Sequence, residues 1–72
     1  MPEKTKYKYI EFKKFEDGVW LINNHKYNEY LGNLEYNKKW KCWELLPANE
    51  TGWTEECLVD VVDFIKQLKK IK

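Results

Sequence analysis

The stretch from Trp53 to Ile71 has the strongest pattern in the chain and predicts one amphipathic helix over about residues 55–70. Thr54 is a favourable N-cap, because its hydroxyl oxygen can accept a backbone N–H that the first helical turn leaves unpaired. Acidic residues follow this cap and lysines crowd the other end, which suits the helix dipole at both ends. Apolar residues recur at helical spacing and predict a broad buried stripe: Cys57, Leu58, Val61, Val62, Phe64, Ile65, Leu68 and Ile71. Because such a helix is marginal alone in water, the rest of the chain must cover this stripe.

The residues before this helix are β-prone, and turn residues divide them into segments. Strands are predicted at about residues 6–15, 19–23, 29–36 and 40–46, while residues 1–5 are expected to be disordered. Asp17-Gly18 is a strong hairpin signal between the first two strands, and Pro47 ends the fourth. Gly32, inside the third strand, indicates a bulge or a close backbone approach.

These elements predict an α+β fold, in which an antiparallel meander of three to four strands packs on one C-terminal α-helix within a single domain, residues 1–72. One helix covers only one face of such a sheet, and strand alternation decides which side chains point towards it. A register slip of one residue would exchange the two faces. The expected contact joins Trp20, Ile22, Leu34, Tyr36, Trp43 and Leu45 of the sheet to Leu58, Val61, Val62 and Ile65 of the helix.

Charge and cysteine content argue against several classes of function. The thirteen lysines and twelve acidic residues give a net charge of +1. Such a small charge predicts no strong electrostatic attraction to nucleic acid or membranes. The chain contains no Arg, the residue that most often recognises guanine bases and phosphates through paired hydrogen bonds. It also contains no Ser, so a serine nucleophile is excluded. Cys42 and Cys57 form no metal-binding motif, so no metal or other cofactor is expected. Since the chain shows no secretory signal and no membrane-spanning run, we expect a cytoplasmic protein with two buried thiols, a single disulfide being the alternative.

Three sets of side chains are candidates for chemistry or binding. His25 beside either cysteine would form a nucleophilic dyad, but it lies in a polar loop, so catalysis is not expected. The acidic residues of the helix form the second set, which a solvated helix face also explains. Aromatic residues interleaved with lysines form the third set, and these could stack single-stranded bases, anchor a protein partner or simply pack in the core. The candidate binding surface comprises Tyr7, Tyr9, Tyr27, Tyr30, Lys38, Lys39, Glu56, Asp60 and Asp63.

A longer pattern runs from Leu31 to Leu68. It consists of Leu31-Gly32-Asn33-Leu34-Glu35-Tyr36, then Trp40, Trp43, Leu45 and Pro47, then Trp53, Cys57-Leu58, Val61 and Phe64-Ile65. This pattern resembles a family of small proteins encoded in bacteriophages and prophages. Tyr36 stands where the family more often has Trp, and Trp43 where it more often has Tyr. The resemblance implies a phage origin and this fold, and it implies no catalytic residues.

The sequence therefore predicts a small non-enzymatic accessory protein of phage type that acts by binding another protein, with inhibition of a host factor or defence system as its role. The alternative is a nucleic-acid-binding module that uses the open sheet face. Self-association, including a homodimer, is a third reading. No membrane partner is expected, because no apolar run reaches spanning length.

Overall fold

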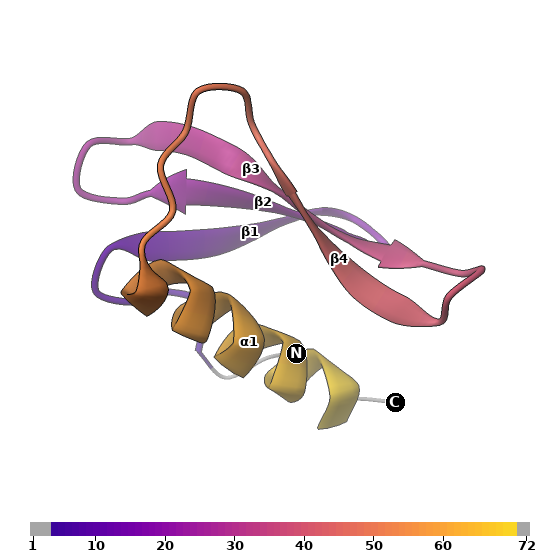
Figure 1. The fold of residues 1–72 in the computed structure, drawn as a ribbon. Coiled ribbons are helices and arrows are strands. Elements are labelled where there is room, and N and C mark those ends of the chain that lie inside the picture. Colours follow the sequence, from indigo (N-terminus) through magenta and orange to yellow (C-terminus); the bar gives the residue numbers. More distant parts are fainter. Residues whose placement is uncertain (1–3, 71–72) are drawn as a thin grey trace.

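The computed structural model describes residues 4–70, which form four strands and one helix. The strands are β1 (Ile10–Glu16), β2 (Val19–Asn24), β3 (Glu29–Asn37) and β4 (Cys42–Pro47), and the helix is α1 (Glu55–Lys70). Neighbouring strands are antiparallel in the order β1-β2-β3-β4, and α1 crosses one face of the sheet (Figure 1). The predicted α+β meander with one C-terminal helix is thus confirmed.

The helix begins and ends at the predicted residues, and its N-cap explains the start. Thr54 Oγ1 accepts the backbone N–H of Cys57 at 3.3 Å, and the Thr54 carbonyl accepts the N–H of Leu58 at 3.0 Å. The predictions for residues 1–3, Ile71 and Lys72 lie outside the described residues. Within residues 4–70, no helix combines the length and the apolar character needed to cross a membrane.

The first strand begins later than predicted, at Ile10 instead of residue 6, because the preceding segment folds back on it. The Tyr7 N–H donates to the Ile10 carbonyl at 2.7 Å, and the Phe12 N–H donates to the Thr5 carbonyl at 2.8 Å. Thr5, expected to be disordered, is therefore tied to β1. The fourth strand also begins late, at Cys42, because Trp40 lies in the turn before it.

The core is centred on Phe64 of α1, which is fully buried. Its ring stacks on Phe12 of β1, with centroids 4.0 Å apart, and meets Trp20 of β2 edge-on at 4.9 Å. Aromatic contacts of this kind add stabilisation to the burial of a large apolar area. The helix thus packs under β1 and β2. Buried side chains around it are Tyr7, Ile10, Phe12, Trp20, Ile22, Leu31, Leu34, Cys57 and Val61.

The predicted helix–sheet contact is right about the sheet face but wrong for two residues of the helix and one of the sheet. Trp20, Ile22 and Leu34 are buried as expected, with Trp43, Leu45 and Ile65 packed around them. Three residues assigned to the core are exposed instead, by 42% for Leu58, 50% for Val62 and 40% for Tyr36. The position of the helix explains this difference. Because α1 packs mainly against β1 and β2, the side chains that it buries are those of Cys57, Val61 and Phe64, and Leu58 and Val62 lie to one side of them.

Gly32 marks both a bulge and a close backbone approach, as the sequence indicated. The register between β2 and β3 shifts at Gly32, so Leu31 becomes an extra residue and turns into the core. Gly32 has φ +153°, and a Cβ there would lie 2.5 Å from the Leu46 carbonyl oxygen. Only glycine allows β4 to run this close to β3.

Candidate functional site

Residues 4–9, which we call the N-terminal segment, lie against one flank of α1 and include part of the predicted binding surface. Tyr7 is buried, and its hydroxyl donates to Asp63 Oδ2 at 2.6 Å. Gln67 Nε2 donates to the same hydroxyl at 2.8 Å and to the Lys4 carbonyl at 3.0 Å. The prediction of Tyr7 as an exposed binding residue is therefore wrong, because it belongs to the core. Asp63 accepts an intramolecular hydrogen bond, and neighbouring Asp60 is half-buried on the same flank.

Two groups on this flank have raised pKa values. Burial raises the pKa of Tyr7, and the hydrogen bond to the Asp63 carboxylate raises it further, because a phenolate there would face a negative charge. Burial also raises the pKa of Asp60; the nearby Lys4 opposes this shift, while Asp63 and Glu56 add to it. The flank thus favours the protonated forms of both groups.

Replacing Tyr7 with phenylalanine is expected to lower the free energy of unfolding by about 2 kcal/mol at neutral pH, because it removes the hydrogen bond to the Asp63 carboxylate and the one from Gln67. The folded-state pKa of Tyr7 is above its ordinary value of 10.0, so its contribution is fully present below that pH and is lost as pH rises beyond it. Urea unfolding at about pH 8 and about pH 11 should show a larger loss for wild type than for Tyr7→Phe. Equal losses would contradict this assignment.

His25 has a structural role at the other end of this segment. Its Nε2 donates to the Tyr7 carbonyl at 2.7 Å and to the Lys8 carbonyl at 2.8 Å. Its backbone N–H donates to the Tyr9 carbonyl at 3.2 Å. Tyr9 is half-buried and packs against the core. Both cysteines are free thiols, and Cys57 is buried as predicted. The prediction of a buried Cys42 is wrong, because strand alternation places it with Glu44 and Leu46 on the sheet face away from α1. The described residues contain no cluster of three potential metal ligands.

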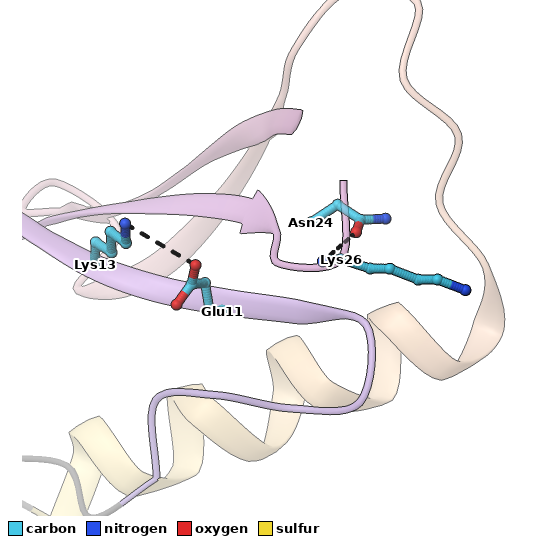
Figure 2. A network of polar contacts seen from close by, with 4 residues as sticks. All are labelled: Glu11, Lys13, Asn24 and Lys26. Atoms are coloured by element: carbon cyan, nitrogen blue, oxygen red, sulfur yellow. Dashed lines mark hydrogen bonds and ion pairs between the residues drawn. The ribbon is translucent and has the colours of Figure 1, made fainter. Parts of the chain in front are cut away.

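The outer sheet face carries several charged and hydrogen-bonded side chains. Tyr30 donates to Asn33 Oδ1, and Asn33 in turn donates to Glu35 at 3.0 Å. Figure 2 shows the Glu11–Lys13 ion pair on β1, with 4.0 Å between its charged atoms, and the Asn24 turn beyond it. Strand alternation places Glu11, Lys13, Glu16, Glu35 and Glu44 on this face. Val19, Leu21, Tyr30 and Leu46 share this face, which therefore combines carboxylates with apolar and aromatic side chains.

Two hairpin turns share one geometry and each presents an aromatic ring. Asn24 Oδ1 accepts the N–H groups of residues 26 and 27, and Asn37 Oδ1 accepts those of residues 39 and 40. In both turns the residue four positions after this asparagine has a positive φ, which is 54° at Asn28 and 57° at Lys41. Tyr27 and Trp40 occupy the same position in the two turns and are 70% and 72% exposed. Tyr27 is thus exposed, as its predicted surface role requires.

A groove of about 610 Å³ lies between the β3–β4 end of the sheet and the C-terminal end of α1. We call it the end groove and define it by Tyr36, Trp43, Leu68 and Lys69. The Tyr36 and Trp43 rings meet edge-on, with centroids 5.4 Å apart. Lys38 and Lys41 also line the end groove, so the predicted residue Lys38 lies in it. Asp17 and Glu35 are the acidic residues on its wall, and Asp17 is paired with Lys14 at 3.3 Å.

We define the apolar flank of α1 as Leu58, Val62 and Ile65, which lie along the helix on the side that carries Lys69, a residue of the end groove. Residues at spacings of four, seven and eleven share a helical flank, so Lys69, in the groove wall, lies on the same flank as Leu58. The opposite flank carries Asp63 and the N-terminal segment. Leu58 and Val62 therefore expose apolar surface on the side that the segment leaves open.

The sequence analysis missed most of this site. The predicted residues Glu56 and Lys39 are exposed but lie outside the lining of the end groove. Tyr36, Trp43, Leu58 and Val62 were assigned to the core. The sequence did contain a signal for the apolar flank. The apolar stripe of the helix is too broad for all of its side chains to be buried against the sheet, so some of them had to remain exposed.

Comparison with protein-family models, with curated proteins and with solved structures finds no match.

Proposed function

We propose that this chain is a small non-enzymatic module that binds another protein through the apolar flank and the end groove. The exposed Leu58 and Val62, on the flank of α1 that leads along the helix to Lys69 in the wall of the end groove, are the observation that carries the proposal. Exposed apolar surface of this kind is typical of protein interaction sites, and aromatic residues such as the Tyr36–Trp43 pair of the groove are common anchors there. The four carboxylates of the outer sheet face, Glu11, Glu16, Glu35 and Glu44, do not favour nucleic-acid binding there.

The resemblance over residues 31–68 supports a more specific role. A phage-encoded module without catalytic groups would act in the bacterial cytoplasm by occupying a surface of a host protein. Inhibition or redirection of a host factor or defence system is the function that fits this size and this surface. The phage origin and the host target are part of the proposal.

Substituting both Leu58 and Val62 with glutamate is expected to abolish partner binding, because two charges would then face the apolar contact. The fold should persist, since both side chains are about half exposed in the free protein. The measurement is affinity capture from a bacterial lysate by tagged wild-type protein and by the variant, with quantitative mass spectrometry of the retained proteins.

The matched control is Leu46→Glu, because Leu46 is 43% exposed, close to the 42% of Leu58, but lies on the outer sheet face. This variant should retain the same proteins as wild type. Retention of no specific protein by wild type, or equal capture by Leu58→Glu/Val62→Glu, would refute the proposal. Light scattering separates self-association, in which wild type alone would have twice the monomer mass.

A further inference from the structure

The β3–β4 turn, residues 38–41 with the sequence Lys-Lys-Trp-Lys, is a fixed and positively charged tip. We call it the basic turn. Asn37 Oδ1 holds it by accepting the N–H groups of Lys39 at 2.9 Å and Trp40 at 3.0 Å. Lys41 completes it in the left-handed backbone region. The Trp40 ring is thus held out from the domain, 72% exposed, between lysines on both sides.

The basic turn shares one end of the molecule with the last turn of α1. Lys38 and Lys41 line the end groove from one side and Lys69 from the other, and both elements lie towards the same end in Figure 1. The ion pairs among residues 4–70 join Lys13 to Glu11 and Lys14 to Asp17, and neither involves these lysines. The other acidic residue of the groove, Glu35, accepts a hydrogen bond from Asn33 at 3.0 Å. The groove lining therefore carries three lysines against the two carboxylates of Asp17 and Glu35, and Lys39 of the basic turn adds to this positive excess.

We propose that the basic turn and the end groove bind single-stranded nucleic acid, a function beyond the protein binding proposed above. Lysines on both sides of the groove suit a phosphate backbone that runs along it, and the free face of Trp40 suits an unstacked base. A duplex keeps its bases stacked and so cannot use that ring. Because all the cations are lysines, which act as point charges, binding should depend on charge and stacking with little base preference.

The test is fluorescence anisotropy of a labelled oligothymidylate of about 12 nucleotides, titrated with the full chain at low salt. Wild type should bind this probe and bind a duplex of the same length more weakly. Trp40→Ala is expected to reduce affinity for the single strand about tenfold, since one base would lose its stacking partner. Lys38→Gln/Lys41→Gln should flatten the slope of log affinity against log salt by about 1.4, for two lost phosphate contacts.

The fold supplies its own control, because Tyr27 occupies the same position in a turn of the same geometry at the other hairpin. Tyr27→Ala removes an equally exposed ring and should leave affinity within about twofold of wild type. Circular dichroism of both variants checks that the fold is intact.

No binding of the oligonucleotide at low salt would overturn the proposal, as would equal losses for Trp40→Ala and Tyr27→Ala. Tighter binding to vesicles of anionic lipid or to polyglutamate than to the oligonucleotide would overturn it too. The Leu58→Glu/Val62→Glu variant should still bind the probe, so the two proposals fail separately.

Discussion

Replacing Phe64 with alanine is expected to lower the free energy of unfolding by about 3–5 kcal/mol, enough to leave a domain of this size largely unfolded. Phe64 is fully buried and is the helix residue that contacts both Phe12 and Trp20 through its ring. Its removal would leave a cavity between the helix and two strands, which rigid strands cannot close. Urea unfolding followed by far-UV circular dichroism measures the loss.

The control for this change is Val59→Ala, on the same helix. Val59 is 66% exposed, so its truncation removes little buried area and should alter stability by less than about 0.5 kcal/mol. If Phe64→Ala and Val59→Ala had similar effects, the helix would not be held by the ring contacts described for it.

Replacing Gly32 with alanine is expected to cost at least about 2 kcal/mol, from backbone strain and from steric overlap together. Gly32 has φ +153°, which side-chain-bearing residues rarely adopt. Its new Cβ would also lie 2.5 Å from the Leu46 carbonyl oxygen and 2.9 Å from Pro47 Cα, both backbone atoms that cannot rotate away. β4 would have to shift, and with it the Ala48 N–H that donates to the Leu31 carbonyl at 2.8 Å.

Gly52→Ala provides the comparison, because a Cβ at Gly52 meets no heavy atom within 4 Å. It should be neutral or slightly stabilising, through the reduced freedom of the unfolded chain. Thermal unfolding of the two variants gives the difference, and amide hydrogen exchange at Ala48 locates it. A Gly32→Ala variant as stable as Gly52→Ala would show that the bulge can accept a side chain.

The elements of this fold were predictable where local chemistry decides them. The helix begins after Thr54 and ends at Lys70 as expected, because a cap and the apolar period act within the segment itself. The start of β1 was not predictable, since residues 6–9 are β-prone, yet they fold back on β1 and are held by contacts with distant residues such as Asp63 and His25. Strand propensity is easily overridden by such tertiary contacts.

The candidate site was largely unpredictable for a related reason. The sequence shows that Leu58 and Val62 belong to an apolar stripe, but not where the helix lies across the sheet. Its position under β1 and β2 follows from the Phe64 contacts, and only that position turns Leu58, Val62 and Tyr36 into surface residues. Trp40 was placed in a strand, because the role of Asn37 in holding the turn does not appear in hydrophobic periodicity.

The N-terminal segment also determines when this domain can close. Its hydrogen bonds join Tyr7 to Asp63 and Lys4 to Gln67, pairs separated by 56 and 63 positions. During synthesis the N-terminal segment can therefore form these contacts only after α1 has been made, and until then the sheet face that α1 covers stays open to water. Closure of the core thus depends on contacts of long sequence separation, which form more slowly than local ones.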